Sequence, residues 1–537
     1  MSTERKGKIT SFVVGAALLL GGCSAAVNDE VNGDVSDTST PEEVLRIGQT
    51  SGIPEVYTTL WQETGSLWQT LVFRSLFMPA ANLTDVTPDL ATAYSVSADG
   101  LSVEIVLTED GVWQDGTPVS VDDVVWSLTT ALKVTYIKSN YVGAFGKIVG
   151  GDAVIAGTET ELSGISVSGS TINIELTQPV NDFIPLLGQF AIYPKHLLEN
   201  ADLLQLQNDP FWLNPVGNGM FKVEKFEPTQ YITLAPSPTW TGVKPQIQRI
   251  EVTGTTDPVS DFEAGKIDYL ITNDVTIIDG LESVDSVTKS PVNALFLRYF
   301  MVNANADNAP FDNPKVREAI IYAIDRATIV ESLYRGAATV VNSGIPAGYP
   351  GYWSGAEDYA FDPELAKSML EDEGFDFSRT IRLRYYYSDP TSKNFMTAIG
   401  QSLNDIGLTT DVQMFQGDAT TGIWTTRDYD LAYKGLSAYS PMEWYLEYTG
   451  TRANAVWGDQ SDIVDLVSTY SQSNTSSEQE SILEDLQRLD QQKMLKLPLY
   501  QIGVFIYTSD RLNGVPASLG NPWWRYDLAF ENWSVSK

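Results

Sequence analysis

Short stretches of alternating apolar and polar residues in the first third of the chain predict β-strands. Residues 103–107 alternate in this way, as do residues 165–167 and 171–176, which flank the sequence Ser168-Gly169-Ser170. A glycine between two serines suits a tight turn, so these two segments predict an antiparallel hairpin. Polar residues dominate positions 24–43, so regular structure is expected to begin near Val44.

Apolar residues spaced three and four apart predict helices interleaved with these strands. Ser120 with Asp123 forms a capping box ahead of an apolar stripe, which predicts a helix start. Asn313-Pro314 opens and Gly336 closes a longer predicted helix, because proline suits the first helical turn and glycine the position after the last. Two more helices are expected, one bracketed by Asp362-Pro363 and Gly374 and one striped by Ile482, Leu483, Leu486 and Leu489. The mixture has no strict βαβ rhythm and predicts a mixed α/β fold.

The first 23 residues have the pattern of an export signal. Basic residues at positions 5, 6 and 8 precede an apolar run over residues 9–20, which is too short to span a bilayer as a mature helix. The run ends in Leu20-Gly21-Gly22-Cys23, which resembles the lipobox of bacterial lipoproteins, where the cysteine thiol receives a diacylglycerol. Residues 1–23 are therefore expected to be a lipoprotein signal peptide with lipidation at Cys23, and the polar residues 24–43 a flexible tether. The mature protein is expected on the extracellular face of the cytoplasmic membrane, which is the periplasmic side in a Gram-negative cell.

Composition argues against several classes of chemistry. The only cysteine is Cys23, so the mature chain has no thiol for a disulfide, for catalysis or for zinc. The only histidine is His196, which is expected to cap or pack rather than serve a Ser-His-Asp triad. A formal net charge of −35 makes nucleic acid a poor partner. No enzyme activity, metal or cofactor is expected, although paired carboxylates for glycoside hydrolysis stay open among 69 acidic residues.

A series of short motifs is spread over most of the chain. In order they are Pro88-Asp89-Leu90-Ala91, Ser97-Ala98-Asp99-Gly100-Leu101, Trp113-Gln114-Asp115-Gly116-Thr117-Pro118, Pro194-Lys195-His196, Asn214-Pro215-Val216-Gly217-Asn218-Gly219, Gly265-Lys266-Ile267-Asp268, Val316-Arg317-Glu318-Ala319-Ile320, Ala323-Ile324-Asp325-Arg326 and Leu403-Asn404-Asp405-Ile406-Gly407-Leu408. Each motif is weak alone, but their order and spacing together resemble the solute-binding proteins of dipeptide and oligopeptide ABC importers, family 5. The resemblance runs from about Val44 to the C-terminus.

This resemblance implies a bilobed, periplasmic-binding-protein-like fold with an extra inserted domain and a ligand cleft between the lobes. On that pattern the first domain is discontinuous, over residues 44–85, 200–292 and 498–537, the inserted second domain covers residues 86–199, and the third lobe covers residues 293–497. The resemblance also implies a monomer that closes on a small solute and delivers it to an ABC permease and ATPase complex. The alternative is a surface receptor or chaperone on the same fold that signals or docks without transport.

The resemblance also points to a ligand-binding segment over residues 434–444. Peptide-binding relatives hold the ligand's amino terminus with an aspartate four residues before a proline, and with Pro441 as that proline, Ser437 stands in the aspartate's place. A hydroxyl cannot neutralise a desolvated ammonium, so a free peptide amine would need Glu443 instead. Oligopeptides are the expected ligand, and oligosaccharides stacked on aromatic rings are the alternative. The expected ligand-binding residues are Trp424, Ser437, Tyr439, Glu443 and Trp444, with Trp61 and Trp68 as further aromatic candidates, although a core role suits each tryptophan at least as well.

Overall fold

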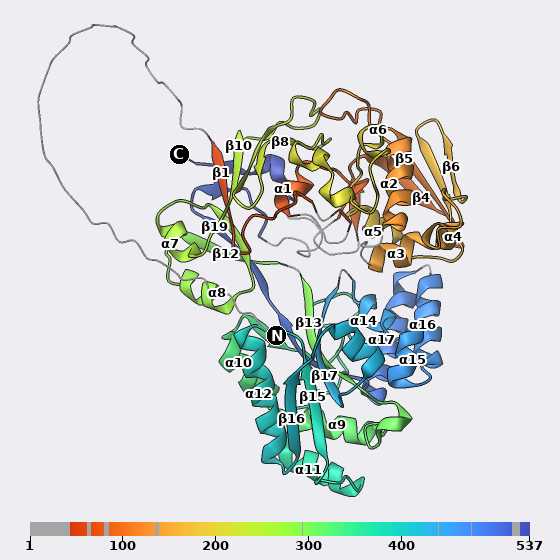
Figure 1. The fold of residues 1–537 in the computed structure, drawn as a ribbon, viewed down its shortest axis with the longest axis vertical. Helices are drawn as coiled ribbons and strands as arrows, with labels where there is room; N and C mark the ends of the chain where they lie inside the picture. Colours follow the sequence, from red (N-terminus) through yellow and green to blue (C-terminus); the bar gives the residue numbers. More distant parts are fainter. Residues whose placement is uncertain are drawn as a thin grey trace, which may run out of the picture. The chain divides into compact units, whose positions relative to one another are not determined.

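The structure, a computed structural model, describes residues 43–58, 60–61, 66–79, 85–134, 139–292, 294–438, 440–473, 475–517 and 527–536 (Figure 1). The expected signal peptide, with Cys23, and the tether up to residue 42 lie outside these ranges. The first element that the structure describes is β1 (Val44–Gln49), which agrees with the start expected from the sequence.

The largest sheet has seven strands in the order β12-β19-β11-β1-β10-β9-β8. β1 pairs in parallel with β10 and β11, and the other neighbouring pairs are antiparallel. The remaining elements of this part are β8 (Phe221–Glu227), β9 (Tyr231–Pro236), β10 (Arg249–Gly254), α7 (Pro258–Glu263), β11 (Tyr269–Thr272), α8 (Val275–Leu281), β12 (Val287–Val292) and β19 (Val504–Ser509). Segments from the beginning, middle and end of the chain therefore share one sheet.

A second sheet, of four antiparallel strands in the order β4-β5-β7-β6, carries the expected hairpin. Ser168 of β6 lies opposite Thr171 of β7, so the hairpin is confirmed. The helix expected after the capping box is confirmed as α2 (Val121–Lys133), in which Ser120 N donates to Asp123 Oδ2 over 2.8 Å. The elements around this sheet are β4 (Ala91–Val96), β5 (Ser102–Leu107), α3 (Ser139–Phe145), α4 (Gly151–Ile155), β6 (Ile165–Ser168), β7 (Thr171–Glu175), α5 (Phe183–Leu187) and α6 (Lys195–Leu198).

The third sheet has six strands in the order β14-β18-β13-β17-β15-β16. Its strands are β13 (Leu295–Val302), β14 (Ala338–Val340), β15 (Thr380–Tyr385), β16 (Thr409–Met414), β17 (Leu431–Ala438) and β18 (Lys496–Ile502). Its helices are α9 (Pro314–Tyr322), α10 (Arg326–Tyr334), α11 (Pro363–Asp372), α12 (Pro390–Asp405), α13 (Ala419–Thr421), α14 (Met442–Leu446), α15 (Thr451–Trp457), α16 (Ser461–Gln472) and α17 (Ser476–Lys493). α11 and α17 confirm the two helices expected after residue 360.

Helices cover both faces of the six-stranded sheet, as Figure 1 shows, with α10 and α12 on one side and α14 and α17 on the other. Side chains alternate between the faces of a strand. Tyr433 of β17 accordingly packs on Phe395 of α12 with ring centroids 5.4 Å apart, while Tyr299 of β13 packs on Trp444 of α14 at 4.8 Å. β13 is therefore apolar on both faces, which explains its nearly continuous hydrophobic sequence.

The single helix expected between residues 313 and 336 is wrong, because the structure has two, α9 and α10. Asp325 interrupts the pattern, since its carboxylate accepts a hydrogen bond from Thr328 N over 3.0 Å and caps a new helix. The start at Pro314 is confirmed, and Gly336 follows the C-cap with a positive φ of 83°. The apolar stripe alone therefore did not reveal the break.

The chain passes between the seven-stranded and six-stranded sheets twice, by neighbouring strands. β12 leads into β13, and β18 returns into β19 through Gly503, whose N–H donates to Ala337 O over 2.8 Å. β18 pairs with β13 and β14 up to Ile502, so the domain boundary expected at residue 498 falls inside a strand of the six-stranded sheet. Two adjacent strand crossings of this kind are suited to act as a hinge.

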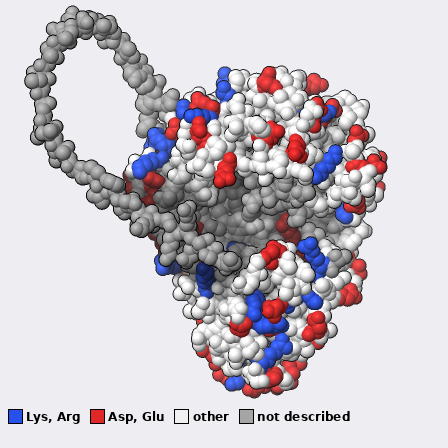
Figure 2. Space-filling model, viewed as in Figure 1, with Lys and Arg blue, Asp and Glu red and all other residues white. Residues whose placement is uncertain are grey.

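Short elements complete the described chain: α1 (Leu67–Thr70), β2 (Phe77–Pro79), β3 (Val86–Pro88), β20 (Leu512–Asn513) and β21 (Ser534–Val535), with single turns at Leu206–Asn208, Pro210–Leu213, Ala306–Asn308, Gly422–Thr426 and Phe530–Asn532. Among the residues that the structure describes, no helix combines the length and the apolar character that crossing a membrane requires. Figure 2 shows acidic and basic side chains interspersed over the viewed face.

Candidate functional site

The end of the six-stranded sheet next to the two strand crossings is the candidate site. We call it the crossing end and define it as residues 295–298 of β13 and 435–438 of β17. The strands are antiparallel, with Leu295 opposite Ala438 and Arg298 opposite Gly435. β15 runs parallel to β17 and delivers Tyr387 just beyond its own last residue. The crossing end thus gathers side chains from three segments that are distant in the sequence.

Arg298 is the central polar group of the crossing end. Its guanidinium carbon lies 4.4 Å from the ring centroid of Tyr387, which is a cation–π distance. Its Nη1 donates to Leu297 O over 3.5 Å, and its Nε is buried without a hydrogen-bond partner among the described residues. Within the described part of the chain, Arg298 forms no ion pair. A half-buried guanidinium with a buried, unpaired Nε is unusual in a protein.

Gly435 makes room for this arrangement. A Cβ built on Gly435 would lie 2.1 Å from Arg298 Nη1 and 2.3 Å from the Tyr387 hydroxyl, so any other residue would displace one of them. Glycine weakens a strand interior, and a close approach by another group is a common reason for its presence there. The contact therefore ties the backbone of β17 to the position of Arg298.

A set of tyrosines surrounds Arg298 on the α12 side of the sheet. The Tyr334 and Tyr500 hydroxyls lie 2.7 Å apart, and the Tyr500 hydroxyl also contacts that of Tyr433. The Tyr386 and Tyr387 hydroxyls form a further pair at 2.8 Å. Burial raises the pKa of Tyr334 and of Tyr500, so these phenols are neutral near pH 7 and supply no counter-charge to the guanidinium.

Of the residues expected to bind ligand, Ser437 lies at the crossing end. It is half-buried and pairs with Phe296, two residues from Arg298 along β13, so Ser437 and Arg298 share the α12 face of the sheet. Tyr439 lies outside the described residues. The expected position of a ligand amine therefore adjoins a cation.

Trp424 and Trp444 lie on the opposite face, around two buried lysines. Trp444 is 1% exposed, and its Nε1 donates to Asp490 Oδ2 over 2.7 Å. The Trp424 ring centroid lies 5.1 Å from Lys434 Nζ, and the Trp444 centroid lies 4.7 Å from Lys496 Nζ. Trp444 therefore belongs to the core, whereas Trp424 is half-buried and packs against it. Both tryptophans lie on the face of the sheet opposite to Ser437.

The lysines are balanced by two carboxylates. Glu447 pairs with Lys434 through Oε1 and with Lys496 through Oε2, the latter over 3.0 Å, while Asp490 also accepts from the Tyr448 hydroxyl. Burial lowers the pKa of both lysines and raises that of Asp490. The cluster is a paired, hydrogen-bonded charge network within the lobe.

The other expected residues are spread over two regions. Glu443 lies in the first turn of α14, next to Trp444, and is half-buried. Trp61 and Trp68 are buried far from this segment in sequence, and Trp61 Nε1 donates to Ala191 O over 3.0 Å. Trp61 lines a cavity of about 20 Å³ with Gln189, whose amide has no hydrogen-bond partner. The structure therefore does not bring together the four expected residues that it describes, and the ligand-binding role of all five stays a prediction.

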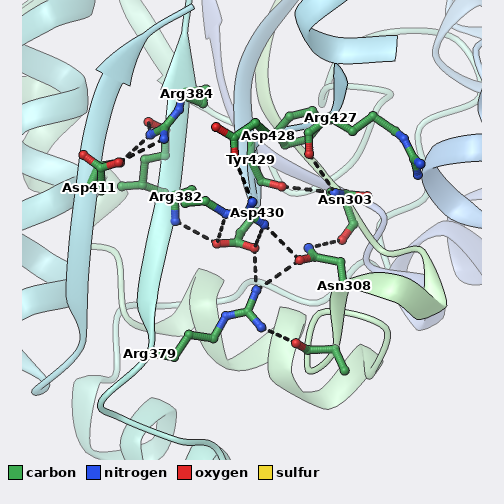
Figure 3. Close-up of polar contacts among 12 residues, drawn as sticks. Asn303, Asn308, Arg379, Arg382, Arg384, Asp411, Arg427, Asp428, Tyr429 and Asp430 are labelled. Carbon is green, nitrogen blue, oxygen red and sulfur yellow. Dashed lines mark hydrogen bonds and ion pairs between the residues drawn. The ribbon is translucent and has the colours of Figure 1, made fainter. Parts of the chain in front are cut away.

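The opposite end of the same sheet is fixed by a separate polar cluster around Asp430 (Figure 3). Asp430 Oδ1 accepts from Arg379 over 2.7 Å and from Arg382 over 2.9 Å, and its side chain is fully buried. Asn308 Oδ1 accepts from the same two arginines. Both carboxylate oxygens of Asp430 and the side-chain amide of Asn308 are hydrogen-bonded, so these groups hold strand ends together rather than bind a solute.

His196 Nε2 donates to Asp115 Oδ2 over 2.7 Å and forms part of no triad among the described residues. No group of three or more metal-ligating side chains occurs in the described part.

Sequence reasoning did not single out Arg298, although a signal was present. It is the only charged residue in the otherwise apolar β13 sequence Leu295–Val302. A charge inside a strand that is buried on both faces must have a partner or a function. The missing information was the identity of its neighbours, which come from other strands.

Comparison with known proteins agrees with this architecture. The model of the family "Bacterial extracellular solute-binding proteins, family 5 Middle" matches residues 85–456. A Brucella ovis protein, provisionally named as an ABC transporter peptide-binding protein, is 26% identical over 389 residues, 69% of each chain. The dipeptide-binding protein of Escherichia coli is 27% identical over 320 residues, 56% of this chain and 57% of that protein.

Solved structures share the fold. The oligopeptide-binding protein AppA from Bacillus subtilis, in complex with a nonapeptide, superimposes with a TM-score of 0.71 at 18% identity, covering 93% of this chain and 100% of that one. The family match spans more than half of the sequence, and the expected mixed α/β, periplasmic-binding-protein-like fold is confirmed. The chain belongs to the bacterial extracellular solute-binding proteins of family 5.

Proposed function

We propose that this protein captures oligopeptides between its two lobes and delivers them to the permease and ATPase of an ABC importer. The observation that carries the proposal is the pair of neighbouring strand crossings, β12 to β13 and β18 to β19, which adjoin the polar crossing end. A solute held there touches both sides of a hinge, so its contacts favour the closed state. Relatives named for peptide and dipeptide binding support the choice of solute.

The protein works outside the cytoplasm as a binding component, in keeping with its family, and we propose that a diacylglycerol on Cys23 anchors it to the membrane. The lipobox-like sequence and the polar segment after it support this anchor. Mass spectrometry of native material should find Cys23 lipidated at a new N-terminus. An exported protein that keeps Met1, or an unmodified Cys23, contradicts the anchor.

The solute class is tested by calorimetric titration of the purified protein. The probes are random-sequence tetrapeptides, their N-acetylated forms and maltotetraose, after a thermal-shift screen of the same mixtures. A ligand that binds only the folded state adds about 2.7 kcal/mol of stability at a hundredfold excess over its Kd. Tetrapeptides should raise the melting temperature and maltotetraose should not. Stabilisation by maltotetraose alone would replace peptide with oligosaccharide as the solute.

The role of Glu443 is tested in the same titration. If Glu443 pairs with the ligand amine, Glu443→Gln should weaken the binding of tetrapeptides with a free amine and leave the affinity for their N-acetylated forms unchanged. A preference for free amines that survives Glu443→Gln would remove Glu443 from the site.

A further inference from the structure

Arg298, which is half-buried, differs from the buried arginines Arg317 and Arg326 of its lobe in what its guanidinium contacts. Arg326 donates to the carbonyls of Val341, Pro498, Asp358 and Tyr359 and to Asn342 Oδ1. Arg317 donates to the carbonyls of Phe311 and Lys493. These two side chains use their donors to tie loops to the core. Arg298 has one long bond, to Leu297 O, and a buried Nε without a partner.

The positive charge of Arg298 also has no counter-charge among the described residues. The buried lysines on the other face of the sheet share Glu447 and Asp490, and Arg379 and Arg382 share Asp430. Within the described residues, the titratable side chains that act most strongly on Arg298 are tyrosines, and the Tyr387 ring centroid lies 4.4 Å from its guanidinium carbon. Holding an unpaired cation in such a place costs stability. Costs of this kind persist in natural proteins mostly where function requires them.

The geometry of the crossing end suits an anion. The Tyr387 ring centroid lies 4.4 Å from the guanidinium carbon, and among the described residues the N–H donors along the guanidinium edge have one partner, Leu297 O. A carboxylate accepts two parallel hydrogen bonds from such an edge. Gly435 keeps the space in which the guanidinium lies, and the half-buried Ser437 shares this face of the sheet.

We propose that Arg298 is the counter-ion for a carboxylate of the bound solute, which in a peptide is the C-terminal carboxylate. The inference rests on the proposed function, and it defines the ligand by its acidic end. The same cation repels an ammonium, so the amine of a peptide points away from this end of the sheet. Ser437 in place of an aspartate is consistent with that polarity, because no amine needs neutralising beside Arg298.

The first experiment compares three random-sequence tetrapeptide mixtures: free at both ends, N-acetylated, and amidated at the C-terminus. The amount retained by the purified protein is measured by equilibrium dialysis and native mass spectrometry. Wild type should retain both mixtures with a free carboxylate at least tenfold more than the amidated one. Arg298→Gln should remove that difference, and so should Gly435→Ala, which keeps the charge but displaces the guanidinium. Arg488→Gln is the matched control, since Arg488 is half-exposed and pairs with Glu484.

Equal retention of amidated and free peptides by wild type would overturn the inference. So would an Arg298→Gln variant that keeps the preference. If no tetrapeptide mixture is retained in any form, the proposed peptide function fails, and Arg298 is then judged by a second measurement that needs no peptide.

The second measurement is the melting temperature of the ligand-free protein. Arg298→Met removes an uncompensated cation and should leave the melting temperature unchanged or raise it. Lys496→Met removes a paired buried cation and should lower it by several degrees. Succinate, a small dicarboxylate, should raise the melting temperature of wild type more than that of Arg298→Met. A loss in Arg298→Met as large as that in Lys496→Met, or equal responses to succinate, would show Arg298 to be a structural residue and overturn the inference.

Discussion

The effect of removing a charged side chain on the stability of this protein depends on whether that side chain is buried and paired with an opposite charge. Asp430 is the clearest paired case, since its fully buried carboxylate is shared by Arg379 and Arg382. Replacing Asp430 with Asn leaves both guanidiniums without their counter-charge and should lower the free energy of unfolding in urea by about 3 kcal/mol. Asp428→Asn is the matched control, because Asp428 is exposed and pairs only with Arg382; it should lose less than about 1 kcal/mol. Equal losses would contradict this account.

The same carboxylate gives a pH dependence. Burial opposes the charge on Asp430, but Arg382, together with Arg379, outweighs burial and holds the pKa of Asp430 below its ordinary value. As the pH falls, the unfolded chain therefore takes up this proton before the folded one does. The stability due to Asp430 is complete above about pH 4 and is lost as the pH falls through the folded pKa. Urea unfolding of Asp430→Asn should accordingly vary less with pH below 4 than that of wild type.

At the scale of elements, helix starts depend on a few side chains. The capping box of α2 is an example in which one side chain, Asp123, makes several hydrogen bonds. Asp123 accepts from Ser120 N and Ser120 Oγ, from Trp113 Nε1 and from Lys195 N, so it joins α2 to two other segments. Asp123→Ala should lower the free energy of unfolding by about 2–4 kcal/mol and raise hydrogen exchange in the first turn of α2. Asp122 directly precedes Asp123 but is exposed, so Asp122→Ala should change the free energy of unfolding by less than about 0.5 kcal/mol. Equal changes in the free energy of unfolding of the two variants would show that the hydrogen bonds of Asp123 add no stability beyond that of an exposed side chain.

At the scale of the whole molecule, contacts between the lobes set the balance between open and closed states. The Asn181 side-chain amide, from the segment after the four-stranded sheet, donates to Tyr470 O of α16. A contact made only when the lobes meet stabilises the closed state alone. Asn181→Ala should therefore weaken tetrapeptide binding by about two- to tenfold, the worth of one hydrogen bond, without changing the melting temperature of the ligand-free protein. Unchanged affinity, or a fall in that melting temperature, would show that the contact does not act in closure.

The sequence by itself determined the local elements and the family. Ser120 with Asp123, the hairpin turn at Gly169 and the bracket from Pro363 to Gly374 act through neighbours within a few residues, so their patterns predicted the structure correctly. The ordered motifs likewise predicted the family, because each marks a local turn or helix start that the fold requires.

Tertiary structure decided the rest. The break at Asp325 depends on a new cap within a continuous apolar stripe, and the extent of β18 depends on its partners β13 and β14. The faces on which Ser437, Trp424 and Trp444 lie follow from strand register and from contacts with distant helices. Arg298 stands out only once the segments carrying Tyr387 and Gly435 are placed beside it, because whether a buried charge has a partner is a property of residues far apart in sequence.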